Sequence, residues 1–367
     1  MPRIVIDARE SGTSTGRYVD KLIEHLHALQ PQQHQFVILT KAERLEFMAH
    51  IAPAFVTIET PFKEFTFDEQ RGFKKQLDSL EADLVHFAMV QQPIRYRGRV
   101  VTTMHDLTTA RFKNPDKNPA VFAVKQSVYK WLNKRAAHKS LAVITPTQYV
   151  KDDVVAYTGI KPDKVTVTYE AADFINEAPV PLDGLAGKQF IMYVGRPTPH
   201  KNLGRLIQAF AELQKNLPEL HLVLAGKLDA NYRLHEAAVQ TAGLPNVVFT
   251  DFISDAQLRW LYEHCSAYVF PSLSEGFGLP GLEAMMHGAP VVSSNATCLP
   301  EVYGEAACYF NPLNEADMAA KIGEVLTNTS LRDHLIFQGK RRAAEYSWER
   351  MAEQTLAVYD AALQHPA

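Results

Sequence analysis

Short apolar runs alternate with helical patterns along this chain of 367 residues. The first apolar run is RIVID at residues 3–7, and a loop of small residues separates it from a helical pattern over about 17–29. Further apolar runs occur at 36–39, 56–58, 84–87 and 100–103. Buried strands that alternate with helices are typical of parallel sheets covered on both faces. The pattern therefore predicts an α/β fold.

The same alternation begins again near residue 188, with apolar runs such as FIMYVG, HLVLAG, AYVFPS and APVVSS. Between the two sets, residues 174–188 contain Pro179, Pro181 and an Asp183-Gly184 pair, which interrupt regular structure. A chain of this length also exceeds a typical single core. We expect a first Rossmann-like domain over 1–176, a linker over 177–187, a second Rossmann-like domain over 188–346, and a helix over 347–367 that packs back on the first domain.

Composition is ordinary for a folded globular protein, with 46% hydrophobic and 22% charged residues. The net charge is −3, so no global field favours nucleic acid. Cys265, Cys298 and Cys308 have no CxxC spacing, which argues against a disulfide framework and a zinc site. The N-terminus has no signal-peptide pattern, and no apolar run approaches the roughly 18 to 20 residues that span a bilayer. We therefore expect a cytoplasmic protein.

The stretch PSLSEGFGLPGLEAMMHGAPVV at 271–292 is the strongest candidate for a ligand site. An apolar lead-in ends in a turn with glycines at 276, 278 and 281, and the turn runs directly into a helix. Glycines allow close backbone approach, and a helix N-terminus carries partial positive charge that suits an anionic ligand. Glu275 and Glu283 flank the turn. Carboxylates only accept hydrogen bonds, so sugar or ribose hydroxyls are their natural partners.

Cations and a histidine follow two other predicted strands. Arg196 and Lys201 come after FIMYVG, and His105 and Asp106 come after VVTTM. Ligands of open α/β sheets bind at the carboxyl ends of strands, and this pair of cations could neutralise a diphosphate leaving group. Surface cations that cap a loop, and a His-Asp pair that only fixes a loop, are the simpler alternatives. No DxD, HExxH or His/Cys cluster indicates a metal site.

The loop before the first helix, ARESGTSTG, contains Gly12 and Gly16. A strand, a small-residue loop and a helix form the layout of a phosphate loop, but these glycines do not make the dinucleotide pattern GxGxxG. An ordinary strand-to-helix turn is the simpler interpretation.

A helical pattern over 120–140 carries basic residues on or near one face. They are Lys125, Lys130, Lys134, Arg135 and His138. A basic face next to aromatic residues can lie on anionic lipid. A solvated outer helix face is the simpler alternative.

In combination, these motifs resemble the retaining glycosyltransferases of family 4, which have the GT-B fold. The resemblance rests on Gly195-Arg196, on Lys201-Asn202, and on PSLSEGFGLPGLEAM with Glu275 and Glu283. It extends to HDL at 105–107, TPT at 145–147 and PVVSSNATCLPEV at 290–302, and so covers nearly the whole chain. It implies two Rossmann-like domains whose parallel sheets face each other across the cleft that holds the site.

The family implies a role for each matching residue. Arg196 and Lys201 would hold the diphosphate of a nucleotide sugar, and Glu283 would bind the ribose hydroxyls. Glu275 would face the donor sugar, and His105 would lie near the donor sugar and the acceptor. Gly16 would let the first-domain loop approach the phosphates. The expected catalytic residues are Arg196, Lys201, Glu275 and His105, and the expected donor-binding residues are Gly16, Gly195, Gly276, Phe277, Gly278, Leu279 and Glu283.

The resemblance also implies a metal-independent reaction without a cofactor. Retention in this family is usually explained by attack on the same face as the leaving group, so no catalytic base is assigned. The chain departs from the family pattern at three places: SGTSTG lacks a doubled glycine, Asp251 stands where glycine is common, and Glu170 stands where an Asn-Gly pair is often found. These departures leave the nucleotide base and the sugar open.

We expect a hexosyltransferase that extends a glycan or a lipid-linked glycan in surface-polysaccharide assembly. The first half of the chain resembles mannosyltransferases most, so GDP-mannose is the first choice of donor and a UDP-hexose the second. A non-hydrolysing sugar-nucleotide epimerase of the same architecture and a catalytically silent binding protein are alternatives. An NAD-dependent oxidoreductase would need GxGxxG, which neither half has. The expected location is cytoplasmic, with peripheral contact at the inner face of the cell membrane if the basic helix binds lipid.

Overall fold

The structure is a computed structural model that describes residues 1–13, 15–112 and 119–365, without the side chains of 119–125. The chain folds into two compact units. The first is formed mainly by residues 1–111, 119–170 and 347–365, and the second by residues 171–346. The chain passes between them at Glu170 and Ala171, before the position expected from sequence. The expected linker, 177–187, is in the second unit, where the Val180 N–H donates to the Ala256 carbonyl at 3.1 Å.

The first unit is built on a parallel sheet of seven strands in the order β3-β2-β1-β4-β5-β6-β7. The interior strand β1 pairs with β2 on one side and β4 on the other, with Ile4 opposite Phe36 and Leu84. The strands are β1 (Arg3–Asp7), β2 (Gln35–Thr40), β3 (Val56–Glu59), β4 (Leu84–Phe87), β5 (Val100–Thr103), β6 (Ala142–Thr145) and β7 (Val165–Val167). The predicted parallel α/β architecture is confirmed for this half.

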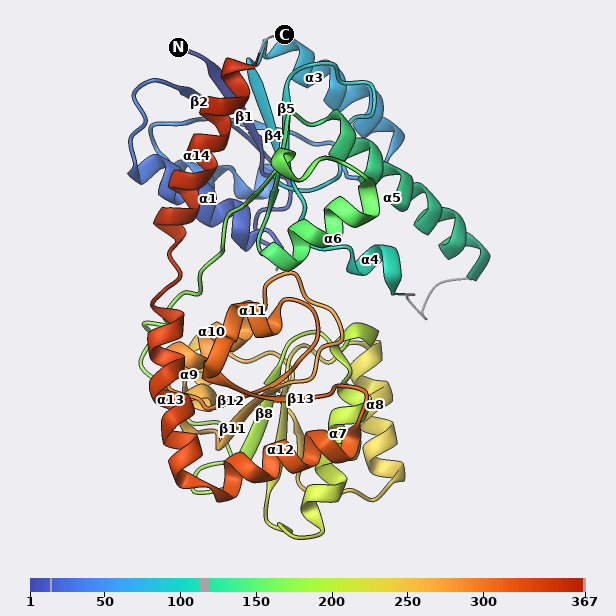
Figure 1. Cartoon of the computed structure of the whole chain (residues 1–367), viewed down its shortest axis with the longest axis vertical. Coiled ribbons are helices and arrows are strands. Elements are labelled where there is room, and N and C mark those ends of the chain that lie inside the picture. Colours follow the sequence, from blue (N-terminus) through green and yellow to red (C-terminus); the bar gives the residue numbers. More distant parts are fainter. Residues whose placement is uncertain (14, 113–118, 366–367) are drawn as a thin grey trace. The chain divides into compact units, whose positions relative to one another are not determined.

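Helices flank this sheet (Figure 1). They are α1 (Arg17–Ala28), α2 (Leu45–Ile51), α3 (Lys74–Ser79), α4 (Thr108–Arg111), α5 (Pro119–Lys139), α6 (Gln148–Thr158) and α14 (Trp348–Gln364). Local signals explain several helix ends. Helix α6 begins where the Thr147 hydroxyl accepts the Val150 N–H, and it ends at Gly159, whose φ of 76° is left-handed. The C-terminal helix α14 begins after Ser347, packs against α1, and joins the first unit.

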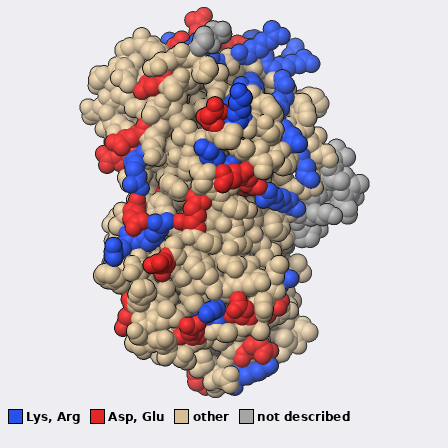
Figure 2. Space-filling view, in the orientation of Figure 1, with Lys and Arg blue, Asp and Glu red and all other residues tan. Residues whose placement is uncertain are grey.

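Lysine and arginine side chains gather on one flank of the first unit, over the region of α3 and α5 (Figure 2). Helix α5 presents Lys130, Lys134 and Arg135 as exposed side chains, while the side chain of Lys125 lies outside the described part of the chain. The expected basic face is therefore exposed over the described part of α5. None of the helices in the described residues is both long and apolar enough to cross a membrane.

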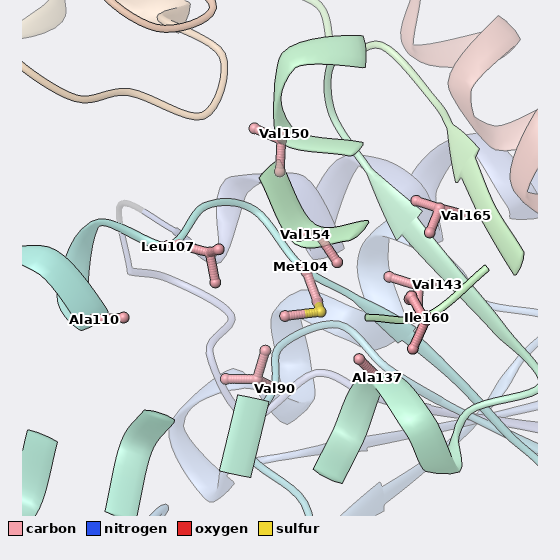
Figure 3. Packing of buried hydrophobic residues seen from close by; sticks show 10 residues of the cluster. All are labelled: Val90, Met104, Leu107, Ala110, Ala137, Val143, Val150, Val154, Ile160 and Val165. Atoms are coloured by element: carbon pink, nitrogen blue, oxygen red, sulfur yellow. The ribbon is translucent and has the colours of Figure 1, made fainter. Parts of the chain in front are cut away.

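A compact apolar cluster fills the space between β5, β6 and the helices α4 to α6 (Figure 3). Its members are Val90, Met104, Leu107, Ala110, Ala137, Val143, Val150, Val154, Ile160 and Val165. Met104 is fully buried directly before His105. Because interiors are close-packed, this cluster holds the carboxyl end of β5 in place and with it the residues that follow the strand.

The second unit contains a parallel sheet of six strands in the order β10-β9-β8-β11-β12-β13. The strands are β8 (Phe190–Val194), β9 (His221–Ala225), β10 (Val247–Phe249), β11 (Ala267–Phe270), β12 (Val291–Ser294) and β13 (Ala307–Phe310). Most are buried on both faces, which explains why they read as continuous apolar runs and do not alternate. The predicted second parallel sheet is confirmed.

Seven helices within the described residues belong to this unit. They are α7 (Leu203–Gln214), α8 (Ala230–Thr241), α9 (Asp255–His264), α10 (Leu279–Met286), α11 (Leu299–Tyr303), α12 (Glu315–Thr327) and α13 (Thr329–Ala343). A capping box between Ser254 and Gln257 starts α9. Helix α10 begins at Gly278, inside the glycine-rich stretch singled out from the sequence.

Candidate active site

The loop after β8 begins with a glycine, and a larger residue at this position would require its neighbours to move. Gly195 has a φ of 144°, and a Cβ there would lie 2.8 Å from the Tyr193 hydroxyl oxygen. Its N–H donates to the Ala225 carbonyl at 3.0 Å, and its carbonyl accepts the Tyr232 hydroxyl at 2.8 Å. These contacts fix the main chain at the point where Arg196 leaves the sheet.

The buried side chain of Asn202 ties this loop to the stretch after β11. Its φ of 62° is left-handed, a conformation that asparagine tolerates better than most residues. Its Nδ2 donates to the carbonyls of Pro271 at 3.1 Å and Pro312 at 2.7 Å. The Leu273 N–H also donates to the His200 carbonyl at 2.7 Å. The loop that carries Lys201 is thereby held beside the loop that carries Glu275.

Lys201 and Glu275 form an ion pair across these two loops. The distance from Lys201 Nζ to Glu275 Oε1 is 2.7 Å, and their side chains are 20% and 13% exposed. Lys201 Nζ also lies 5.5 Å from the centre of the Phe270 ring, and the Glu275 N–H donates to the Thr297 hydroxyl at 3.2 Å. The structure thus pairs Lys201, which is expected to bind the diphosphate, with Glu275, which is expected to face the donor sugar.

The glycines at 278 and 281 leave room for one buried tyrosine. Gly278 has a φ of 100°, and its carbonyl accepts the Tyr303 hydroxyl at 2.6 Å. A Cβ on Gly278 or Gly281 would lie 2.6 Å or 2.2 Å from that same hydroxyl oxygen. Burial raises the pKa of Tyr303 well above its ordinary value, so the hydroxyl stays neutral. The sequence predicts glycines for the approach of a ligand, and here two of them serve the packing of the turn.

Glu283 lies in the helix that follows this turn and is only 8% exposed. Its Oε2 accepts the Tyr262 hydroxyl at 3.3 Å. Its carbonyl is 2.8 Å from His287 Nδ1, while His287 Nε2 accepts the Ile175 N–H at 3.2 Å. This pattern assigns the proton of His287 to Nδ1. Glu283 is thus held in a hydrogen-bonded environment on α10.

In the first unit, Gly16 stands at the start of α1, where the loop folds onto itself. A Cβ at this position would lie 1.8 Å from the Glu10 carbonyl oxygen. The Gly16 N–H donates to the Thr13 carbonyl at 3.1 Å and to the Thr13 hydroxyl at 3.0 Å. The loop therefore requires a glycine for its own conformation, and the expected approach to phosphate stays a prediction.

His105 follows β5 in the first unit and contacts a glutamate that the sequence did not assign to the site. His105 Nδ1 is 3.2 Å from Glu170 Oε1, and Nε2 is 3.0 Å from the Ala88 carbonyl oxygen. The Tyr18 ring packs edge-on at 4.7 Å. Burial acts to lower the pKa of His105, but the hydrogen bond and charge of Glu170 oppose it and the pKa is raised.

The structure also explains a departure from the family pattern. Asp251 has a φ of 58°, a left-handed conformation that glycine adopts most readily. The Asp251 carboxylate accepts the Leu228 N–H at 2.9 Å. This bond lowers the pKa of Asp251, and it offsets part of the free-energy cost of the left-handed conformation for a residue other than glycine.

Sequence reasoning missed Asn202 and Tyr303 as supports of the site, and it noted Glu170 only as a departure. Asn202 was visible as the second residue of the KN motif. Tyr303 carries no sequence signal that relates it to Gly278.

Two family models match the chain: "Glycosyltransferase Family 4" over residues 15–174 and "Glycosyl transferases group 1" over residues 182–342. The O-antigen chain mannosyltransferase B of Escherichia coli is 30% identical over 278 residues, which covers 71% of this chain and 70% of that protein. The chain belongs to glycosyltransferase family 4. It is therefore a retaining glycosyltransferase, as its motifs predicted.

Other similarities extend this result. The serotype-specific mannosyltransferase WbdA of Escherichia coli is 32% identical to this glycosyltransferase over 252 residues, but the match spans only 30% of WbdA and 64% of this chain. The structure of Anabaena HepE in complex with UDP-glucose superposes with a TM-score of 0.74 at 17% identity, over 98% of this chain and 100% of that one. The predicted GT-B fold is confirmed.

Proposed function

We propose that this glycosyltransferase transfers mannose from GDP-mannose to a glycan or a lipid-linked glycan of surface-polysaccharide assembly. The observation that carries the choice of sugar is the similarity to mannosyltransferase B, which spans most of both chains. The acceptor class follows from the same relative, whose name places it in the O-antigen chain.

The donor-binding role rests on the loops after β8 and β11. Arg196 and Lys201 supply positive charge for the diphosphate, and Glu275 accepts hydroxyl groups of the donor sugar. The 2.7 Å pair between Lys201 and Glu275 keeps both side chains oriented before the donor arrives. Glu283 accepts the ribose hydroxyls. The main chain of Gly195, Gly276, Phe277, Gly278 and Leu279 lines the donor.

The proposed reaction places the stabilising charge on the leaving group. As the bond between the anomeric carbon and the diphosphate oxygen breaks, negative charge grows on the departing nucleoside diphosphate. Preorganised cations stabilise such charge because they need no reorganisation during the step. Arg196 and Lys201 have this role, and we propose that His105 serves the sugar and Gly16 the phosphates. The acceptor hydroxyl oxygen attacks the face that the diphosphate leaves, and its proton passes to the departing phosphate oxygen. Attack on this face retains the anomeric configuration.

A UDP-hexose is the second donor, and the UDP-glucose complex of the HepE structure supports it. A thermal-shift screen with GDP, UDP, ADP and their sugars separates these donors, since a ligand at 100 times its dissociation constant adds about 2.7 kcal/mol of stability. GDP-mannose should give the largest shift. No shift with any nucleotide sugar would refute the proposal. Release of an epimerised sugar nucleotide in the absence of acceptor would indicate an epimerase instead.

We also propose that the basic face of α5 contacts an anionic membrane from the cytoplasmic side. Trp131 and Val128 are each 50% exposed on this helix, next to the exposed Lys134 and Arg135. Arg135 also lines a neighbouring hollow together with Arg95 and Arg97. Exposed aromatic and aliphatic groups among cations suit the interface of an anionic bilayer. Such contact would bring the enzyme to a lipid-linked acceptor.

A further inference from the structure

Both ring nitrogens of His105 face oxygen atoms. The Ala88 carbonyl can only accept a hydrogen bond, so Nε2, at 3.0 Å from it, carries a hydrogen. Nδ1 lies 3.2 Å from Glu170 Oε1. Without a hydrogen on Nδ1, the lone pair of this nitrogen would face the lone pairs of the carboxylate and no hydrogen bond would form. A second hydrogen, on Nδ1, satisfies both groups. The geometry therefore fits an imidazolium ion paired with a carboxylate.

Other charged and titratable groups surround this ring, but none replaces Glu170. Asp106 is next in the chain, and its Oδ1 accepts the Thr108 N–H at 2.7 Å. His86 on β4 is buried, which together with the charge of His105 lowers its pKa to about 3, so it is neutral. Burial raises the pKa of Tyr18, so this tyrosine is neutral as well. Among the described side chains, Glu170 is the carboxylate that contacts the His105 ring.

We propose that Glu170 is a positioning residue for sugar transfer, which keeps His105 doubly protonated and fixes the orientation of its ring. The inference rests on the role proposed above for His105 next to the donor. Both ring N–H groups are already bonded to protein oxygens, so His105 acts through its charge and not as a proton donor. A preorganised charge of this kind stabilises negative charge that develops during a reaction.

The charge of Glu170 distinguishes it from a neutral hydrogen-bond acceptor at the same place. A neutral asparagine could orient the ring but could not hold a second proton on it. The Glu170 side chain is only 7% exposed, so its charge acts on His105 with little screening by solvent. The carboxylate therefore supports a cation directly after β5.

The first arm of the test measures protonation directly. Histidine-labelled full-length enzyme is titrated by NMR, and the His105 signal is assigned by its loss in the His105→Gln variant. In the wild type, His105 should titrate above the usual value of about 6.5. In Glu170→Gln, which keeps size and hydrogen bonding, its pKa should fall by about 1 to 3 pH units. Asp360→Asn is the matched control because Asp360 pairs with His34 at 2.7 Å, and it should leave His105 unchanged.

The second arm measures the pH profile of kcat with the donor that binds best. The loss of activity at high pH should move to lower pH in Glu170→Gln by the same amount as the His105 titration. Glu170→Asp should restore part of the profile because it keeps the charge. A purely structural role would lower kcat without this movement.

The outcomes separate the two proposals. An unchanged His105 titration in Glu170→Gln would overturn the inference whatever the activity. A shifted His105 titration with an unshifted pH profile of kcat would also overturn the inference about Glu170, because the charge would then not serve sugar transfer. In that case, turnover by the wild type would still support the proposed function. A wild type that transfers no sugar would refute the proposed function, and the titration arm would still decide whether Glu170 holds the proton on His105.

Discussion

Lys201 Nζ lies 2.7 Å from Glu275 Oε1, although 74 positions separate the two residues in the chain. The contact joins the loops that follow β8 and β11 and places opposite charges next to each other at the candidate donor site. In the proposed donor site, Glu275 would orient Lys201 before the donor binds, and the incoming diphosphate would compete with the carboxylate for the ammonium group. Both partners should therefore affect the reaction.

Removal of the Lys201 charge should slow transfer strongly. Lys201→Ala is expected to lower kcat/KM by about 10² to 10³, the range for loss of one preorganised group that stabilises transition-state charge. Steady-state kinetics with the best donor provide the measurement. Lys215→Ala is the control, because Lys215 is 65% exposed and forms an ion pair with nearby Glu212. Equal kinetics for the two variants would show that Lys201 does not act on the leaving group.

Glu283 should contribute mainly to donor binding. Glu283→Gln replaces a charged acceptor by a neutral one, and loss of hydrogen bonds to a charged group corresponds to about 1.5 to 3 kcal/mol, or about 10- to 100-fold in donor affinity. Calorimetric titration with the nucleoside diphosphate measures the change. Tyr262→Phe, which removes the 3.3 Å bond to Oε2, should have a smaller effect. Unchanged affinity in Glu283→Gln would remove this residue from the ribose site.

The turn at Gly278 should not tolerate a side chain. Gly278→Ala combines a left-handed φ of 100° with a Cβ only 2.6 Å from the Tyr303 hydroxyl oxygen. The conformation alone costs roughly 1 to 2 kcal/mol, and the contact adds to it. Urea denaturation measures the resulting loss in the free energy of unfolding. Gly243→Ala is the control, since its φ is +61° with no atom within 4 Å of a Cβ. Addition of Tyr303→Phe to Gly278→Ala should recover part of the lost stability. Equal losses in the free energy of unfolding for Gly278→Ala and Gly243→Ala would contradict a role for the contact with Tyr303.

Buried His86 should make the protein sensitive to acid. Its Nδ1 lies 2.6 Å from the Tyr359 hydroxyl and its Nε2 2.8 Å from the Thr103 hydroxyl, and burial lowers its pKa to about 3. Below about pH 6.5, the unfolded chain takes up a proton that the folded chain does not. The free energy of unfolding should therefore fall, as pH falls from about 6.5 towards 3, by up to about 1.36 kcal/mol per pH unit from this residue.

His105 acts in the opposite direction, because its folded-state pKa is raised. Its stabilising contribution is fully present below about pH 6.5 and is lost as pH rises through the folded-state pKa. Urea denaturation at several pH values tests the contribution of His86 to the pH dependence of the free energy of unfolding. His86→Gln should be less stable than wild type at pH 7 but lose less stability between pH 7 and 5. Parallel pH dependences in the two proteins would contradict this account.

The basic face of α5 should bind anionic vesicles. Trp131→Ala combined with Lys134→Glu should reduce cosedimentation with vesicles that contain phosphatidylglycerol, because each cation near an anionic surface contributes about 1 kcal/mol. Lys215→Glu, a charge reversal in the second unit, is the control. Binding should also weaken as salt is raised. Identical cosedimentation of all three proteins would support a solvated outer face for α5.

The order of elements was readable from the sequence to a large extent. The apolar runs at 3–7, 84–87 and 100–103 coincide closely with β1, β4 and β5, because a strand buried on both faces leaves a local signal. The ends of α6 also have local signals, because Thr147 caps its start and Gly159 its end. The division at residues 170 and 171 was not readable in this way, because the proline-containing segment after it packs on α9 and does not form a free linker.

By itself, the sequence determined the parallel α/β architecture, the family, and the loops that carry the candidate residues, since each of these depends on local periodicity or on a short motif. Only the tertiary structure paired Lys201 with Glu275, placed Tyr303 against Gly278, and brought Glu170 to His105. These contacts join different strand ends, so they depend on strand order, register and main-chain turns that no short window of sequence contains. The pairing of charges, and with it the protonation of His105, is therefore a property of the folded chain.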